Sequence, residues 1–179
     1  MPEVRPAAAD GAPGAAAARL RALAGWLAWA AAVILLDQAT KAWISGALAY
    51  AERIRILPVF DLTLLFNTGA AFSFLAEDGG AQRWLFTGIA LLAAVLILRW
   101  LYTHGGQRLL CAALACILGG ALGNAIDRVM HGHVIDFLLF HWRDAWYFPA
   151  FNVADVAITC GAGLLILDEI LRARRARSS

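Results

Sequence analysis

Four long apolar stretches, separated by polar connections, dominate the chain. They run from Ala22 to Leu36, from Trp84 to Tyr102, from Leu109 to Ile126, and from about Phe151 to Leu167, the last interrupted by Asp155. A helix needs about 20 apolar residues to cross a bilayer. The pattern therefore predicts four transmembrane helices, with both chain ends on the same side of the membrane.

The first stretch is too short to cross a membrane alone, so the helix predicted there continues past Asp37 and Lys41 and covers residues 22–44. An acid followed by a base four residues later pairs favourably on one helix face. Arg19 and Arg21 precede the stretch, as basic residues also precede a cleaved signal peptide. The three later apolar stretches favour a helix that is retained.

The longest connection carries strand-like patterns. Residues 53–56 alternate between Arg and Ile, and residues 59–66 are rich in strand formers. Asn67-Thr68-Gly69 is typical of a turn, after which residues 70–75 are again mostly apolar. We therefore expect a small extracytoplasmic β-sheet within residues 53–75.

Outside this core, residues 1–18 are rich in alanine and proline and predict a disordered tail. Residues 172–179 predict a basic cytoplasmic tail. A single membrane-embedded domain is expected to fill residues 19–171.

Composition agrees with a membrane protein. Of the 179 residues, 61% are hydrophobic and 16% charged, whereas soluble domains are about 45–50% apolar and about 25% charged. The net charge of +2 gives no basic field for nucleic acid. Three cysteines in apolar surroundings do not form a disulfide or metal-binding pattern.

The distribution of charge predicts the orientation. Cytoplasmic connections of membrane proteins carry an excess of Lys and Arg. Nine basic residues fall on the side of the termini: Arg5, Arg19, Arg21, Arg99, Arg108, Arg172, Arg174, Arg175 and Arg177. The other side has six basic residues and nine of the thirteen acids. Both termini are therefore predicted to be cytoplasmic and the acid-rich side to face outward.

Two acids in apolar surroundings are candidates for chemistry. Asp136 lies within the apolar run of residues 134–140, and Asp155 interrupts the fourth stretch. Two close carboxylates do not both ionise easily, so one can act as a general base on water and the other as a general acid. The alternative is that each acid is structural, paired with an Arg or capping a helix.

Other polar residues are spaced to join them. Asn124 and Asp127 are three residues apart, as are Asn152 and Asp155, so each pair shares a helix face. Arg128 either neutralises a carboxylate at the site or forms a plain ion pair with Asp127. The glycines at 119, 120, 123, 161 and 163 favour close helix packing.

Several enzyme classes lack their signatures here. The serines have no nucleophile motif, and the sequence contains neither His-Glu-x-x-His nor Gly-x-Gly-Asp. His131, His133 and His141 raise the possibility of a metal site, but without metal-type spacing and in what is expected to be an exposed connection. Any catalysis must therefore rest on the carboxylates.

Five short motifs together identify a family. They are Asp37-Gln38-Ala39-Thr40-Lys41, Asn67-Thr68-Gly69-Ala70-Ala71-Phe72, residues 119–128, residues 132–137, and Phe151-Asn152-Val153-Ala154-Asp155. In this order, on four predicted spans, they resemble the bacterial lipoprotein signal peptidases, also called signal peptidase II. The resemblance covers residues 37 to about 163.

The resemblance implies an aspartic endopeptidase of four transmembrane helices, with Asp136 and Asp155 as its catalytic dyad. It further implies that seven residues contact substrate or shape the site: Asp37, Lys41, Asn67, Gly69, Asn124, Arg128 and Asn152. The implied substrate is a diacylglyceryl-modified prolipoprotein, cut just before its lipidated Cys. No metal or organic cofactor is expected.

The resemblance also implies an environment and partners. The enzyme is expected in the bacterial inner membrane, in contact with membrane lipid, as a monomer, and sensitive to globomycin-type inhibitors. Two rivals from other classes are a transporter component with relay acids and a structural membrane subunit. Because the nine outward acids lie on one side, interfacial chemistry is favoured over transport.

Overall fold

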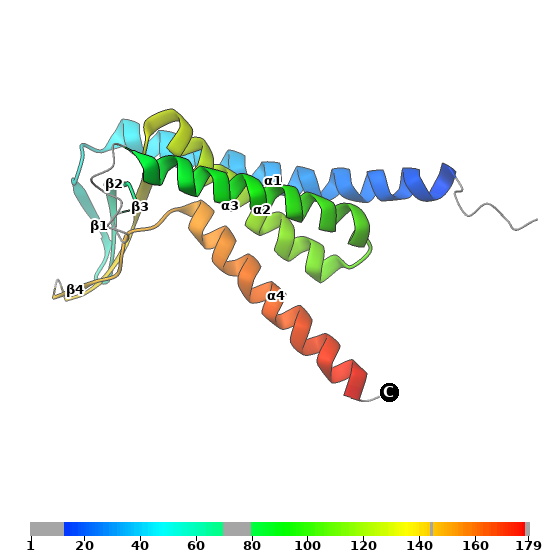
Figure 1. Cartoon of the computed structure of the whole chain (residues 1–179). Helices are drawn as coiled ribbons and strands as arrows, with labels where there is room; N and C mark the ends of the chain where they lie inside the picture. Colours follow the sequence, from blue (N-terminus) through cyan, green and yellow to red (C-terminus); the bar gives the residue numbers. More distant parts are fainter. Residues whose placement is uncertain (1–12, 70–79, 144, 178–179) are drawn as a thin grey trace, which may run out of the picture.

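The computed structural model describes residues 13–69, 80–143 and 145–177 of the chain. These form the helices α1 (Pro13–Ala47), α2 (Ala81–His104), α3 (Arg108–His131) and α4 (Val153–Arg177), with the strands β1 (Arg53–Leu57), β2 (Phe60–Asn67), β3 (Val134–Trp142) and β4 (Trp146–Tyr147). Figure 1 shows the sheet at one end of the helices. A mostly helical membrane fold with a small antiparallel sheet is thus confirmed.

Helix α3 is the centre of the helical part and packs against α1, α2 and α4. Its glycines permit close approach: a Cβ added at Gly119 would lie 2.7 Å from the Cβ of Val33 on α1. On α4, a Cβ added at Gly161 would lie 2.6 Å from Ile117 Cγ1. The packing role predicted for these two glycines is therefore confirmed.

The four strands pair antiparallel in the order β1-β2-β3-β4. The strand-like patterns at 53–56 and 59–66 correspond to β1 and β2, while residues 70–75 lie outside the described residues. Strand β3 was not predicted. Its first four residues are all buried, so the alternation by which a half-exposed strand is recognised is missing there.

Apolar contacts join the sheet to the helices. Ile44 and Leu48, at the end of α1, form one core with Leu64 of β2 and with Ile135 and Phe137 of β3. A second core lies among α1, α2 and α3. The sheet is therefore held against the helix ends near which the two predicted dyad residues lie.

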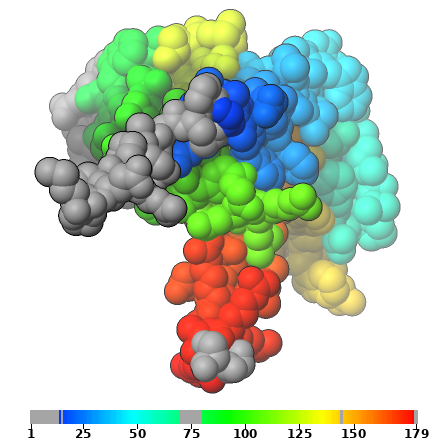
Figure 2. Space-filling view, turned by 90° about the vertical axis from the view of Figure 1, so that its right-hand side faces the viewer, coloured from blue at the N-terminus to red at the C-terminus, as the bar shows by residue number. Residues whose placement is uncertain are grey.

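By length and composition, the described residues contain three helices able to cross a membrane: Ala16–Ala47, Ala81–His104 and Arg108–His131. The expectation of four spans is supported for these three. Helix α4 is long enough but includes Asp155, Asp168, Glu169 and Arg172. Figure 2 shows its C-terminal part projecting from the rest of the molecule.

Two helix boundaries differ from the expected tails. Helix α1 begins at Pro13, within the expected disordered tail, because proline fits the first turn of a helix and the following alanines favour one. Residues 1–12 lie outside the described residues. Helix α4 continues to Arg177, so most of the expected basic tail is helical.

Candidate active site

Asp136 reaches the site on β3, soon after α3 ends. The chain reverses at Gly132, whose φ of 83° is readily adopted by glycine and whose N–H donates to the Arg128 carbonyl at 3.1 Å. Asp136 then pairs in register with Leu65 of β2 and is only 2% exposed.

Two amides hold the Asp136 carboxyl. Asn67 Nδ2 donates to its Oδ2 at 3.0 Å, and Asn152 Nδ2 donates to its Oδ1 at 2.7 Å. Burial raises the pKa of Asp136 from 3.8 to about 6, and the charge of Asp155 adds to this rise. The two amide donors act in the opposite direction. Asp136 is therefore suited to exchange a proton near neutral pH.

Asp155 lies in the first turn of α4 and is half-buried. It forms a capping box with Asn152: Asn152 Oδ1 accepts the Asp155 N–H at 3.0 Å, and Asp155 Oδ2 accepts the Asn152 N–H at 3.2 Å. Asn124 Nδ2 also donates to Asp155 Oδ1 at 2.8 Å. These donors, and the positive end of the helix dipole, favour a negative charge at Asp155.

The lead into α4 places Asn152 beside both acids. Phe151 pairs with Leu138 of β3: its carbonyl accepts the Leu138 N–H at 2.9 Å, and its N–H donates to the Leu138 carbonyl at 3.0 Å. Asn152 comes next in the chain, fully buried. Its side chain therefore reaches back to Asp136 while its backbone N–H binds Asp155.

A buried group of charges, here called the Lys41 cluster, adjoins these residues. It consists of Asp37, Lys41 and Asp127, with Lys41 Nζ 2.7 Å from Asp37 Oδ2 and 2.7 Å from Asp127 Oδ2. The predicted pairing of Asp37 with Lys41 is confirmed. Lys41 Nζ also donates to Asn124 Oδ1 at 3.0 Å, which connects the cluster to the residue that binds Asp155.

Sequence reasoning gave Asp127 a different partner and overlooked Gln38. The sequence places Asp127 on one helix face with Asn124 and offers Arg128 as an ion-pair partner, whereas in the structure its oxygens bind Lys41 and Gln38 Nε2, the latter at 2.8 Å. Gln38 also donates to the Gly123 carbonyl at 3.2 Å. A glutamine next to Asp37 in an apolar helix was the available signal for this role.

Arg128 is half-buried at the rim of the site. Its Nη1 donates to the Asn124 carbonyl at 3.3 Å, and its guanidinium lies 5.1 Å from the centre of the Phe86 ring. Gly69 supports the site indirectly: its N–H donates to Asn67 Oδ1 at 2.8 Å, and its φ is 90°. That contact orients Asn67, whose Nδ2 is left to bind Asp136.

The predicted site residues thus fall into two contiguous groups. Asp136, Asp155, Asn67, Asn124 and Asn152 form a hydrogen-bonded set, and the Lys41 cluster joins it at Asn124. Asn124 and Asn152 are themselves in contact, with Asn152 Nδ2 3.1 Å from Asn124 Oδ1.

The histidines lie elsewhere. His141 is buried rather than exposed as expected, because it occupies the inward face of β3, where its Nε2 lies 3.2 Å from Asp61 Oδ1. The rings of His131 and His133 lie 6.0 Å apart. Among the described residues, no three His, Cys, Asp or Glu side chains form a group that could hold a metal ion.

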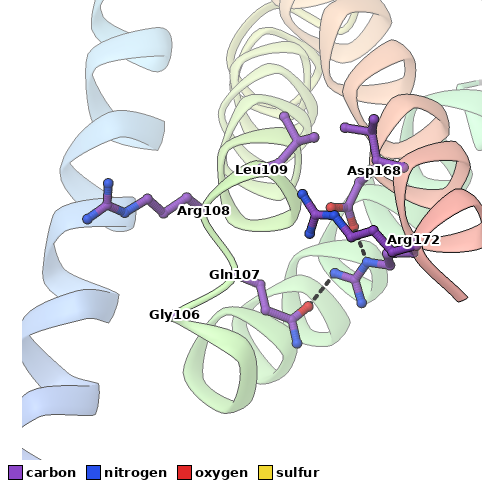
Figure 3. A pocket seen from close by; sticks show the side chains of 8 residues that line it. Gly106, Gln107, Arg108, Leu109, Asp168 and Arg172 are labelled. Carbon is purple, nitrogen blue, oxygen red and sulfur yellow. Dashed lines mark hydrogen bonds and ion pairs between the residues drawn. The ribbon is translucent and has the colours of Figure 1, made fainter. Parts of the chain in front are cut away.

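A separate hollow of about 460 Å³ lies at the opposite end of α3 (Figure 3). Arg172 Nε donates to Asp168 at 2.7 Å, and the same guanidinium donates to Gln107. These bonds hold α4 to the connection between α2 and α3. Since none of the predicted site residues lines this hollow, we assign the candidate active site to the Asp136 region.

The chain is similar to known proteins. Residues 29–171 match the family model described as signal peptidase (SPase) II. A "Lipoprotein signal peptidase" of Paraburkholderia phymatum is 56% identical over 155 residues, 87% of this chain and 93% of that protein. Another, from Cupriavidus necator, is 53% identical over 150 residues, 84% of this chain and 85% of that protein.

Solved structures are similar as well. One, described as "Bacterial membrane enzyme structure by the in meso method at 1.9 A resolution", is 27% identical with a TM-score of 0.72. The match covers 80% of this chain and 91% of that chain. A second, at 2.3 Å resolution, is 26% identical with a TM-score of 0.73 and covers 84% of this chain and 90% of that chain.

Proposed function

The chain belongs to the signal peptidase II family and is a bacterial membrane protease that removes signal peptides from prolipoproteins, and we propose that Asp136 and Asp155 are its catalytic dyad. The observation that carries this proposal is the double role of Asn152. One residue binds the carboxyl group of Asp136 through its side chain and that of Asp155 through its backbone N–H. Two acids held by one residue can share a substrate carbonyl and a water.

The two carboxyls differ in surroundings, and this difference assigns their roles. Asp155 is held by Asn124 and by the first turn of α4, which stabilise its ionised form. Asp136 is almost completely buried, and its pKa is raised to about 6. We therefore assign the general base to Asp155 and the proton-bearing general acid to Asp136.

The reaction follows from these roles. Asp155 takes a proton from water, whose oxygen attacks the scissile carbonyl carbon, while Asp136 gives its proton to the carbonyl oxygen. The resulting tetrahedral intermediate collapses as the C–N bond breaks. Asp155 delivers its proton to the leaving nitrogen, and the proton on the intermediate returns to Asp136. Water is the only co-reactant, so no metal or organic cofactor takes part in this scheme.

Arg128 and Asn67 are proposed to help bind the substrate. The half-buried guanidinium of Arg128 at the rim is suited to a peptide carbonyl, in which developing negative charge needs donors. Asn67 ends β2 and presents its amide beside Asp136. An extended signal peptide would run past this strand end and place its scissile bond at the dyad.

The substrate is proposed to be a prolipoprotein carrying diacylglycerol on the Cys after the cut. Acyl chains anchor that Cys in the outer leaflet, so the scissile bond would lie at the outer interface. We place the dyad there, with both termini cytoplasmic and α4 as a fourth span. At about 1.5 Å per residue, the 25 residues of α4 exceed a bilayer core of about 30 Å. Ile166, Leu167 and Ile170 on this helix are exposed, as lipid-facing side chains would be.

The test is cleavage of a diacylglyceryl prolipoprotein by purified protein in detergent or lipid. Asp136→Asn and Asp155→Asn should each abolish cleavage while the proteins still insert and purify like the wild type. Asp168→Asn, at the other end of α4, is the matched control and should cleave normally. A globomycin-type inhibitor should block turnover of the wild type. Substantial cleavage by either dyad variant would reject the assignment.

A further inference from the structure

The Lys41 cluster lies next to the dyad. Among the described residues, no hydrogen bond or ion pair joins one of its side chains to a dyad side chain. We infer that Asp37, Lys41 and Asp127 are positioning residues that fix the separation of the two dyad carboxyls. They act by holding the backbone N–H group immediately before each catalytic Asp. This inference rests on the proposed dyad and gives a function to charges that the reaction itself does not use.

The two acids of the cluster make equivalent contacts. Asp127 Oδ2 accepts the N–H of Ile135 at 3.1 Å, and Ile135 directly precedes Asp136. Asp37 Oδ1 accepts the N–H of Ala154 at 2.9 Å, and Ala154 directly precedes Asp155. Each dyad residue is thus attached, one peptide upstream, to a different carboxylate of the cluster.

Lys41 fixes the distance between these two anchors. Its ammonium contacts both carboxylates at 2.7 Å, and the three side chains are at most 2% exposed. Hydrogen bonds to ionised groups are shorter and stronger than neutral ones, and packing around buried groups leaves little room for movement. The path from Ile135 through Asp127, Lys41 and Asp37 to Ala154 is therefore a short, stiff connection between β3 and α4.

The origin of the cluster explains why such a connection is needed. Asp37 and Lys41 come from α1 and Asp127 from α3, whereas the dyad comes from β3 and α4. No covalent element sets the distance from Asp136 to Asp155 except the connection through β4. The catalytic geometry of a shared-proton pair depends on a separation accurate to a fraction of an ångström, and a displacement of about 1 Å can cost about 100-fold in rate.

The charges also determine which variants can test the inference. Substituting Lys41 would leave two buried carboxylates without a cation. Asp37→Asn or Asp127→Asn instead leaves Lys41 with one acid, a neutral pair, which favours a folded protein. Asn keeps an oxygen that can accept the backbone N–H, whereas Leu, of similar size, keeps none. The Asn and Leu variants at each position thus separate hydrogen bonding from packing.

The first measurement is hydrogen exchange of the Ile135 and Ala154 amides in the full-length protein, which needs no catalysis. Asp127→Leu should speed exchange at Ile135 at least about tenfold more than at Ala154, and Asp37→Leu should do the reverse. Exchange that rises equally at both amides in both variants would indicate general loosening and would overturn the inference.

The second measurement is steady-state cleavage by the same proteins. The Leu variants should lose about 100-fold in kcat with KM changed less than threefold, and the Asn variants should recover at least part of that loss. Asp61→Asn is the matched control, a buried acid of β2 that binds His141, and it should keep wild-type kcat.

The outcomes separate the two proposals. If wild-type protein fails to cleave the lipidated substrate, the proposed function is rejected. The hydrogen-exchange experiment still tests whether the cluster holds the Ile135 and Ala154 amides. If the wild type cleaves and a Leu variant keeps full kcat, or loses activity only through KM, the positioning role is rejected. A loss of kcat that is as large in the Asn variants as in the Leu variants at both positions would also contradict the positioning role.

Discussion

Substituting Asp136 by Asn should make the protein more stable at neutral pH while destroying its activity. The reason is the cost of ionising a buried carboxyl. In the folded chain the pKa of Asp136 is raised to about 6, compared with 3.8 when exposed. Between these values the folded state binds a proton that the unfolded state releases. The free energy of unfolding therefore falls as pH rises from about 4 to about 6, and changes little above that.

The size of the effect follows from the two pKa values. At 1.36 kcal/mol per pH unit, Asp136 lowers the free energy of unfolding at pH 7 by about 3 kcal/mol relative to its protonated form. An amide at this position carries no charge. However, its nitrogen cannot accept from Asn67 or Asn152, and losing one such bond costs about 1–2 kcal/mol. Asp136→Asn should therefore gain about 1–2 kcal/mol at pH 7.

The assay is thermal unfolding of purified protein in detergent at a fixed heating rate, at pH 4.5 and pH 7.5. The wild type should unfold at the higher temperature at pH 4.5, and Asp136→Asn should show a smaller difference and a higher midpoint than the wild type at pH 7.5. Gly163→Leu retains Asp136, adds its side chain in open space and removes no titratable group, so it should keep the wild-type difference. A variant less stable than the wild type at pH 7.5, with the pH difference unchanged, would refute the reasoning.

Three further predictions concern the same site. Asn67→Ala removes a donor that lowers the Asp136 pKa, so that pKa should rise and the alkaline limb of kcat/KM should move to higher pH; a limb that stays in place would contradict the acid role of Asp136. Gly120→Leu should impair folding and cleavage because its side chain would collide with the Ala154 carbonyl, whereas Gly163→Leu has open space and should behave like the wild type in yield and activity assays. Treatment with EDTA should leave the cleavage rate unchanged, and loss of activity restored by added metal would argue for a metal-dependent reaction.

The elements best predicted from sequence are those whose signal is local. Long apolar runs predicted the helices, and alternation predicted β1, because each pattern depends only on neighbouring residues. Asp37 and Lys41 could be paired because an α-helix fixes the distance between positions four apart. The capping box of Asn152 and Asp155 is equally local. Helix capping is the structural alternative that the sequence offers for each acid, and the three-residue spacing predicts a shared helix face.

What could not be predicted depends on tertiary contacts. The first part of strand β3 is a continuous apolar run without alternation, apart from Asp136, because both of its faces are buried there. The role of Asp127 as acceptor for the Ile135 N–H leaves no sequence signal, since almost any residue offers a backbone N–H. The partner of His141 could not be predicted either, because Asp61 lies on a different strand and far away in the sequence.

The distribution of charge across the site favours Asp136 as the proton carrier of the proposed dyad. Asp37 and Asp127 share Lys41, and Asp155 has the first turn of α4 together with Asn124. Asp136 accepts hydrogen bonds from two neutral amides and is almost completely buried. Among the described residues, no cation is in direct contact with its carboxyl. Ionising a carboxyl costs most where compensation is weakest. Burial of Asp136 therefore favours a proton on that carboxyl. Because Asn152 holds it beside Asp155, the proposed general acid and general base lie next to each other.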